Sequence, residues 1–281
     1  MKHYKAIFFD WDGTAVLSRK APVEDAVNAM RPLLDKGVKL CIVSGTTYEN
    51  IAGGKLHSYF TPKQLENLYL GLGRGAFDYG YDATGQPTIL VDRVPDAKGI
   101  LAVHDACYRI HRELLEKYDM NTDIVFSRPN YCKMDLMPAN NRGENLFLQE
   151  GEAARLQHIL QQHGIDSIET VIAMAESFGT PEMPLRATTD AKYLEVGPTG
   201  KSDNVDALFA RFGFAAEDCC FWGDEFIGVT DSIFGSDAGM LTETTQNGDF
   251  YDVSDLEGVR PGQVKKLGGG IQTFLNFLRE Q

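Results

Sequence analysis

Residues 6–14 read Ala6-Ile7-Phe8-Phe9-Asp10-Trp11-Asp12-Gly13-Thr14 and join an apolar run to two closely spaced carboxylates. The consecutive apolar residues predict a short strand that is buried on both faces, as in a parallel sheet. Ligands of open α/β sheets bind just beyond the carboxyl ends of such strands. The sequence therefore places its chemistry at Asp10 and Asp12, and Gly13 allows a sharp bend directly after them.

The two carboxylates also predict a bound cation. At about 4 Å and an effective dielectric constant of about 20, two like charges repel each other by roughly 4 kcal/mol. A divalent cation removes this repulsion, and hard carboxylate oxygens suit Mg²⁺. An isolated Asp-Gly pair would indicate only a turn with a helix cap, so this interpretation depends on the elements that follow.

The composition is that of a globular protein of one large domain or two. The chain has 281 residues, of which 43% are hydrophobic and 24% charged, and its net charge is −13. The negative charge argues against nucleic-acid binding, but an anionic substrate is compatible with it because exposed charges are screened beyond about 8 Å. Five cysteines without paired spacing indicate reduced thiols. No apolar run is long enough to cross a bilayer, so we expect a cytoplasmic protein with no membrane partner.

A second element follows the first strand within one βα unit. Residues 22–36 predict a helix and residues 38–43 a nearly continuous apolar strand, so the two strands form a parallel βαβ unit. The end of the second strand then lies beside the carboxylates. Ser44 supplies a hydroxyl there, and Gly45 lets the backbone approach a ligand closely. We expect a helix to begin near Thr46, where its free N–H groups would form a phosphate site.

The middle of the chain has a different pattern of predicted helices and strands. Two amphipathic helices are predicted together with strand runs that do not alternate regularly with them, which indicates an inserted α+β domain. The predicted domains are a core of residues 1–83 and 189–281 and an insert of residues 84–188. Arg74 is expected to be solvated. Three basic residues of the insert could contact a substrate or simply carry surface charge, and surface charge is favoured for each: Arg128, Lys133 and Arg142. The insert's predicted helices cover residues 96–118 and 152–163, and its strand runs lie near residues 123–126, 131–137, 167–174 and 184–196.

Two further elements lie beyond the insert. Lys201 precedes a predicted helix over residues 203–212, and a lysine at a helix start is unfavourable for the helix dipole, which indicates a nearby anion. A further apolar strand ends at Gly223-Asp224-Glu225, and more acids follow at Asp231 and Asp237. Short strands over residues 238–242 and 250–253 and a closing amphipathic helix complete the prediction.

These elements, taken in order, resemble the motifs of the haloacid dehalogenase superfamily, most of whose members are Mg²⁺-dependent phosphohydrolases. The resemblance implies an α/β fold, with a Rossmann-like doubly wound parallel sheet as the core. An insert between Ser44 and Lys201 resembles the C2-type cap of the Cof-like and phosphomannomutase-like subgroup (subfamily IIB), which folds over the site. The loop from Gly223 to Asp231 departs from the Gly-Asp-x-x-Asn-Asp pattern of Cof-like proteins, because Thr230 stands in place of the asparagine.

The resemblance also implies roles for individual residues. It makes Asp10 the nucleophile and Asp12 the general acid/base. The expected phosphate-binding residues are Ser44, Gly45 and Lys201. The expected ligands of Mg²⁺ are Asp10, the backbone carbonyl of Asp12, and Asp224, and candidates to orient metal-bound water are Glu225 and Asp231.

Three functions remain open at this point. The leading expectation is a phosphatase that hydrolyses a small phosphate monoester, a sugar phosphate above all, through an aspartyl-phosphate. A sugar phosphomutase is the second, although no second phosphate site can be identified in the sequence. A catalytically silent protein that binds a phosphorylated ligand is the third, and the presence of both Asp10 and Asp12 argues against it. The expected partner is a small phosphorylated metabolite, and the expected state is a monomer or a homodimer.

Overall fold

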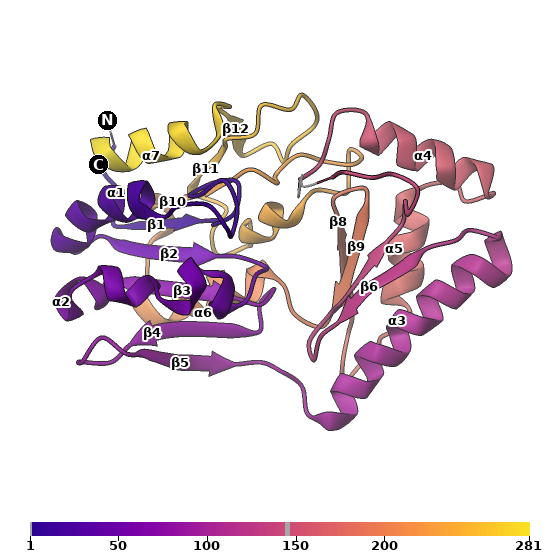
Figure 1. The fold of residues 1–281 in the computed structure, drawn as a ribbon, viewed down its shortest axis with the longest axis horizontal. Helices are drawn as coiled ribbons and strands as arrows, with labels where there is room; N and C mark the ends of the chain where they lie inside the picture. Colours follow the sequence, from indigo (N-terminus) through magenta and orange to yellow (C-terminus); the bar gives the residue numbers. More distant parts are fainter. Residues whose placement is uncertain (1, 144–146) are drawn as a thin grey trace.

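Two sheets organise the computed structural model, which describes residues 2–143 and 147–281. The larger sheet has eight strands in the order β12-β11-β10-β1-β2-β3-β4-β5, and the smaller has four in the order β6-β7-β9-β8. Figure 1 shows the small sheet standing between the large sheet and the helices α3 (Ala97–Tyr118), α4 (Glu152–Gln162) and α5 (Ile168–Glu176). No helix in the described residues combines the length and apolar character needed to span a bilayer.

The first strand lies near the middle of the large sheet. β1 (Ala6–Phe9) pairs in parallel with β10 (Cys219–Gly223) and with β2 (Lys39–Val43), and Phe9 lies opposite both Trp222 and Ile42. This register brings the carboxyl ends of the three strands to one edge. The outer strands are β3 (Leu68–Leu72), β11 (Asp249–Asp252) and β12 (Val264–Lys266), which are parallel, and the antiparallel hairpin of β4 (Phe77–Tyr81) and β5 (Pro87–Asp92).

Helices cover both faces of this sheet, as the continuous apolar run of β1 predicts. Ile7 and Phe9 point to one face, where they share a core with α1 (Glu24–Asp35) and α7 (Gly270–Glu280). Ala6 and Phe8 point to the other face, which is covered by α6 (Lys201–Phe212). The predicted doubly wound α/β fold is thereby confirmed.

The small sheet has one face toward its helices and one toward the large sheet. Its strands β6 (Asp123–Ser127), β7 (Cys132–Asp135), β8 (Arg186–Thr189) and β9 (Tyr193–Gly197) are all antiparallel. Along β7 and β9, Cys132, Met134 and Leu194 point into an apolar core shared with α3, α4 and α5. Alternate residues, including Lys133 and Glu195, line the space between the two sheets. We call the small sheet with these three helices the cap.

The structure differs from the predicted elements in several places. The insert predicted over residues 84–188 differs at both ends, because β5 belongs to the large sheet and β9 to the small one. The predicted strand over residues 167–174 is helix α5, whose buried side chains Ile168, Val171, Ile172 and Ala175 follow a helical spacing. The predicted strand over residues 238–242 is wrong as well, because a 3-10 helix, Ser236–Met240, occupies most of that segment.

Candidate active site

The loop after β1 is shaped by its contact with the loop after β10. The backbone N–H of Asp10 donates to Trp222 O at 2.9 Å, which continues the pairing of the two strands by one residue. Gly13 has a φ of +88°, and a Cβ at this position would lie 2.2 Å from Asp224 Oδ2. Thr14 Oγ1 donates to Asp224 Oδ1 at 2.9 Å. A glycine is therefore required here both for the backbone angle and for the approach of Asp224.

Lys201 is the charged centre of the site. It is the first residue of α6, and its Nζ donates to Asp10 Oδ1 at 2.9 Å and to Asp237 Oδ1 at 2.6 Å. The residue is only 6% exposed. Burial by itself lowers the pKa of Lys201, but the carboxylates of Asp10 and Asp237 outweigh burial and raise it above its usual value. The lysine therefore stays protonated at the start of a helix because two carboxylates bind it there.

Asp237 has no assigned role in the sequence analysis, and the structure places it in the centre of the site. Its side chain is 0% exposed, and Oδ2 accepts a hydrogen bond from the backbone N–H of Glu225 at 2.7 Å. A Cβ at Gly223 would lie 2.2 Å from the same oxygen, so the glycine before Asp224 makes room for Asp237. No periodic pattern in the sequence marks this aspartate, which reaches the site from a short 3-10 helix.

Asp231 lies elsewhere. It is exposed and is not among the residues that line the cleft. Its neighbours connect the core to the cap, because Thr230 Oγ1 and Ser232 Oγ each donate to Glu169 Oε1 at 2.6 Å. Thr230, which replaces the asparagine of the Cof-like pattern, therefore contacts helix α5. By contrast, Glu225 lines the cleft beside Asp237, and burial followed by the charges of Asp190 and Asp237 raises its pKa to about 7.

The contact with Glu169 predicts a pH-dependent contribution to stability. The hydroxyls of Ser232 and Thr230 lower the pKa of Glu169 to about 2. Because the folded pKa lies below the unfolded value of about 4.3, the contribution is present above that value and is lost as pH falls toward 2. We expect Glu169→Gln to lower the free energy of unfolding by about 1 kcal/mol at pH 7, a figure reduced for partial exposure, and by less at pH 3. Urea denaturation at both pH values measures this, and an equal loss at both would contradict it.

The two aspartates after β1 are both buried, and burial affects their protonation. Burial raises the pKa of Asp10 to about 7, an effect that Lys201 opposes and Asp237 reinforces. Burial also raises the pKa of Asp12, and the guanidinium of Arg19, 3.8 Å from Asp12 Oδ2, opposes it. Lys201 bonds the Asp10 carboxylate directly, whereas one oxygen of Asp12, Oδ1, is buried and left without a hydrogen-bond partner among the described residues.

The predicted ligands of Mg²⁺ are all oxygen atoms, the ligand type that this ion prefers. Burial, together with the carboxylates of Asp237 and Asp10, raises the pKa of Asp224 well above its usual value. Within the described residues, no group of three or more His, Cys, Asp or Glu side chains is arranged to hold a metal ion. The predicted set needs only the carboxylates of Asp10 and Asp224 with the backbone carbonyl of Asp12. Few protein ligands are enough for Mg²⁺, because the ion keeps several bound waters and also binds substrate phosphate oxygens.

The loop after β2 reaches the same cleft. Ser44, Gly45 and Thr46 all line it, and the backbone N–H of Ser44 donates to Gly71 O of β3 at 2.9 Å. The helix expected near Thr46 is absent, because the chain forms a 3-10 helix of three residues, Tyr48–Asn50, instead. A phosphate site at this loop would therefore consist of the Ser44 hydroxyl and loop N–H groups rather than the end of an α-helix.

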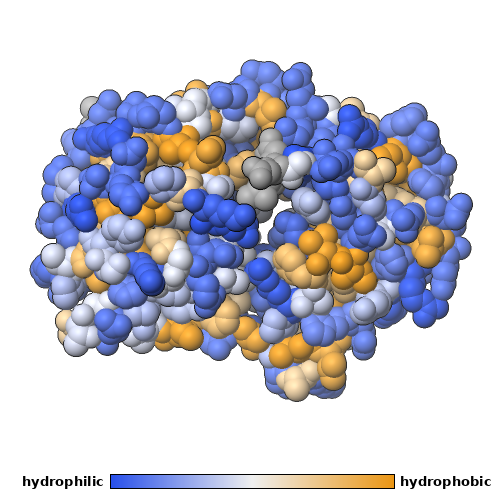
Figure 2. Space-filling view, viewed as in Figure 1, coloured by the Kyte–Doolittle hydropathy of each residue, from blue (hydrophilic) through white to orange (hydrophobic). Residues whose placement is uncertain are grey.

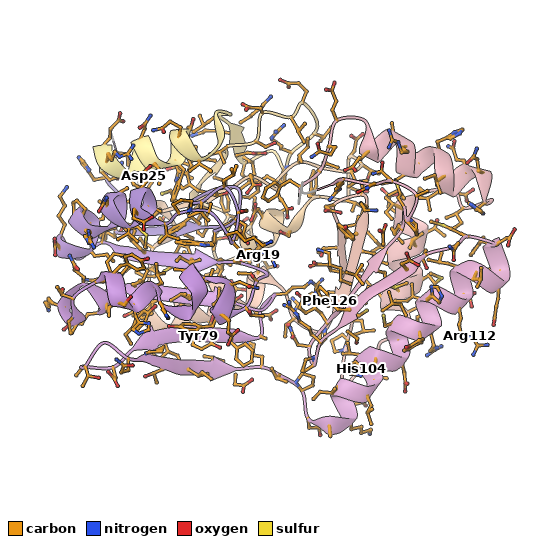
Figure 3. The ribbon with its side chains drawn as sticks, viewed as in Figure 1. Arg19, Asp25, Tyr79, His104, Arg112 and Phe126 are labelled. Carbon is orange, nitrogen blue, oxygen red and sulfur yellow. The ribbon has the colours of Figure 1, made fainter. Side chains whose placement is uncertain are left out.

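The cleft lies between the core and the cap and has a volume of about 940 Å³. Figure 2 shows it as a hollow between the two halves of the molecule. Figure 3 shows Arg19, from the loop after β1, on the opposite side of this space from Phe126 of β6. Basic side chains from both halves line the cleft, although the chain as a whole has a net charge of −13.

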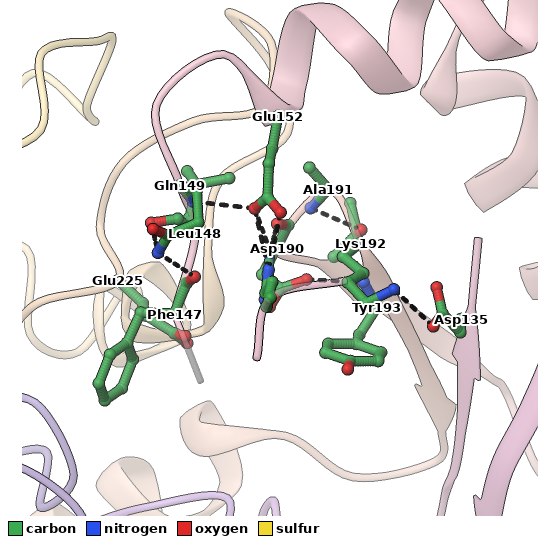
Figure 4. A network of polar contacts seen from close by, with 12 residues as sticks. Asp135, Phe147, Leu148, Gln149, Glu152, Asp190, Ala191, Lys192, Tyr193 and Glu225 are labelled. Atoms are coloured by element: carbon green, nitrogen blue, oxygen red, sulfur yellow. Dashed lines mark hydrogen bonds and ion pairs between the residues drawn. The ribbon is translucent and has the colours of Figure 1, made fainter. Parts of the chain in front are cut away.

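Arg74, which is expected to be solvated, and Arg142, for which ordinary surface charge is favoured, both have buried side chains. Arg74 is 4% exposed, and its guanidinium donates to Thr199 O at 2.6 Å and to Glu195 O at 3.2 Å, which ties a core loop to the cap. Arg142 Nη2 bonds Glu152 Oε2 at 2.5 Å, and Nη1 bonds Asp190 Oδ2 at 2.7 Å. Figure 4 shows the surrounding polar network, in which Glu152 and Asp190 lie close together, and Asp190 also lines the cleft. Arg74 thus bonds backbone carbonyls at the edge of the cleft, and Arg142 bonds two carboxylates of the cap.

No family model matches the chain, and no curated protein matches its sequence. Solved structures do share its fold. IMP-bound IMP-nucleotidase of Plasmodium falciparum superposes with a TM-score of 0.61 at 13% identity, over 99% of this chain and 66% of that one. The sucrose-phosphatase of Synechocystis, in complex with sucrose and phosphate, superposes with a TM-score of 0.58 at 12% identity, over 98% of this chain and 96% of that one.

The chain is shorter than one of these proteins. It spans 52% to 66% of the length of the IMP-nucleotidase structures to which it is similar. It matches the sucrose-phosphatase over nearly all of both chains, so the similarity includes the cap as well as the core. The chain therefore shares the fold of these two proteins, cap included.

Proposed function

We propose that the protein is a Mg²⁺-dependent phosphatase that hydrolyses a small phosphate monoester through an aspartyl-phosphate on Asp10. The observation that carries the proposal is the bond from Lys201 to Asp10 at the carboxyl end of β1, with Asp12 and Asp224 in the adjoining loops. A lysine placed in this way stabilises the ionised form of Asp10 and offers positive charge to a bound phosphoryl group. Mg²⁺ held by Asp10, Asp224 and the Asp12 carbonyl would supply further charge to the same group.

The residues divide the reaction into two steps. In the first, a carboxylate oxygen of Asp10 attacks phosphorus, the bond from phosphorus to the leaving oxygen breaks, and Asp12 gives that oxygen a proton. In the second, Asp12 takes a proton from water, the water oxygen attacks phosphorus, and the bond to Asp10 breaks. Ser44 and Lys201 bind the non-bridging oxygens in both steps, so that positioning and charge neutralisation supply most of the rate.

The cleft supports a small substrate. A volume of about 940 Å³ accommodates a phosphorylated sugar, and both the core and the cap line it. The cap excludes bulk water from the phosphoryl group, and its opening releases product. Two proteins of similar fold are named for phosphatase reactions on a nucleotide and on a phosphorylated sucrose, and a sugar phosphate is our leading substrate class.

Release of inorganic phosphate tests the proposal. We expect the purified protein to hydrolyse p-nitrophenyl phosphate and members of a panel of sugar phosphates. Excess EDTA should lower the rate at least tenfold, and added Mg²⁺ should restore it, because the carboxylate cluster repels an anionic substrate without the ion. Unchanged turnover in EDTA would contradict the role of Mg²⁺.

Two other results would replace the proposed function. Conversion of a sugar 1-phosphate to its 6-phosphate without released phosphate would identify a phosphomutase. Tight binding of phosphorylated ligands with no turnover, in the presence of Mg²⁺, would identify a binding protein.

A further inference from the structure

The basic side chains that line the cleft differ in what they contact. Lys133 Nζ lies 3.1 Å from Glu195 Oε1, and Arg74 Nε lies 3.5 Å from Glu195 Oε2. Arg186 forms an ion pair with Asp203. Each of these charges already has a carboxylate partner. By contrast, the Arg128 guanidinium forms no ion pair with any carboxylate in residues 2–143 and 147–281.

Arg128 is nevertheless held in place. Its guanidinium carbon lies 4.6 Å from the ring centre of Phe126 and 5.5 Å from that of Tyr131, and its Nη1 donates to Tyr131 Oη at 3.0 Å. Cation–π contacts of this kind fix the guanidinium without neutralising its charge. A side chain already ordered in this way loses little conformational entropy when it binds a ligand. Arg128 is therefore an ordered cation with N–H groups left for an acceptor.

The turn that carries Arg128 is anchored to the core. Asn130, between β6 and β7, donates from Nδ2 to Gly73 O at 2.7 Å and to Thr199 Oγ1 at 3.2 Å. Tyr131 Oη, which accepts from Arg128, also donates to Gly45 O at 3.4 Å. One side chain thus separates the Arg128 guanidinium from the loop that follows β2, where Ser44 lies. The cation sits close to the proposed phosphate site but belongs to the cap wall of the cleft.

We propose that Arg128 binds a second anionic group on the substrate, a carboxylate or a phosphate on the part that leaves. A guanidinium recognises either group through paired, charge-assisted hydrogen bonds. The preferred substrate is then a phosphate ester with another anion a few bonds from the reacting phosphorus, such as a phosphorylated hydroxy acid or a sugar bisphosphate. This inference rests on the proposed phosphatase function and narrows its substrate class.

Matched substrates test the inference. Glycerol 3-phosphate and 3-phosphoglycerate differ by a hydroxymethyl and a carboxylate group, and fructose 6-phosphate and fructose 1,6-bisphosphate differ by one phosphate. We expect the wild-type protein to prefer the second member of at least one pair in kcat/KM. We expect Arg128→Ala to reduce that preference by roughly 10- to 100-fold, the value of a charge-assisted hydrogen bond, while hydrolysis of p-nitrophenyl phosphate changes less than about threefold.

Arg112→Ala is the matched control. Arg112 is an exposed arginine on α3 that pairs with Glu116, and it does not line the cleft, so its loss should leave every preference unchanged. Wild-type protein with no preference in either pair would overturn the inference. Arg128→Ala with equal losses on all substrates, p-nitrophenyl phosphate included, would also overturn it, because Arg128 would then serve the reacting phosphoryl group or the fold.

Calorimetric binding separates this inference from the proposed function. We expect wild-type protein, with Mg²⁺ present, to bind 3-phosphoglycerate more tightly than glycerol 3-phosphate or fructose 1,6-bisphosphate more tightly than fructose 6-phosphate. Arg128→Ala should remove the difference. This result supports the second anion site whether or not turnover occurs. Absence of p-nitrophenyl phosphate hydrolysis would count against the phosphatase alone, and equal affinities within both pairs would overturn the anion site alone.

Discussion

Asp10→Asn is expected to lower kcat/KM by roughly 10⁴-fold or more, because an amide oxygen is a poor nucleophile and cannot form the acyl phosphate. The side chain keeps its size, so Lys201 and the strands around it retain their packing. We expect the variant to unfold at a denaturant concentration close to that of the wild type. Phosphate release from p-nitrophenyl phosphate measures the activity, and acid quenching with labelled substrate shows whether phosphate is attached to the wild-type chain.

Asp231→Asn is the control for this change. It alters an aspartate that is exposed and lies outside the cleft, so we expect full activity. The comparison also tests the sequence-based role of Asp231 in orienting metal-bound water, which its position does not favour. Turnover that survives Asp10→Asn, or a labelled chain in that variant, would end the covalent mechanism.

Gly13→Ala is expected to remove most of the activity and also to destabilise the fold. The positive φ of +88° costs an alanine about 1–2 kcal/mol, and the new Cβ would stand 2.2 Å from Asp224 Oδ2. The carboxylate of Asp224 must then move from its position beside Thr14. Because small displacements of catalytic groups have large effects, we expect a fall in kcat/KM of at least roughly 100-fold. A higher Mg²⁺ concentration for half-maximal activity should accompany it.

Gly37 provides a matched control for the energetic cost of placing an alanine at a positive φ. Its φ is +82°, similar to that of Gly13, but a Cβ there would meet no atom within 4 Å. We expect Gly37→Ala to lose about 1–2 kcal/mol of unfolding free energy and to keep its activity and its Mg²⁺ dependence. Equal activities for the two alanine variants would show that the contact between Gly13 and Asp224 has no part in the site.

The parts of the structure that follow from local sequence were predictable. β1 is marked by four consecutive apolar residues, and the carboxylates after it mark the edge where the strands end. β2 and β10 are apolar runs of the same kind, and each is followed by a polar residue of the site. For such segments, residues next to one another in the sequence indicate both that the strand is buried and where it ends.

Other features depend on contacts between distant segments and leave no local pattern. Asp237 and Asp231 look alike in the sequence, but only Asp237 is buried against Lys201. Arg74 bonds to residues more than a hundred positions away, so its burial cannot be read from its neighbours. Helix α5 was predicted as a strand because its short apolar run satisfies both patterns, and only its packing in the cap selects the helical spacing.

The route of the chain out of the cap links the two halves mechanically. β9 ends at Gly197 in the cap sheet, and α6 begins at Lys201 in the core, so three residues join the cap to the lysine that bonds Asp10. The Arg74 guanidinium donates a hydrogen bond to Thr199 O within these three residues. A movement of the cap relative to the core would therefore act directly on the residue whose ammonium group bonds Asp10, and would change the charge around that carboxylate.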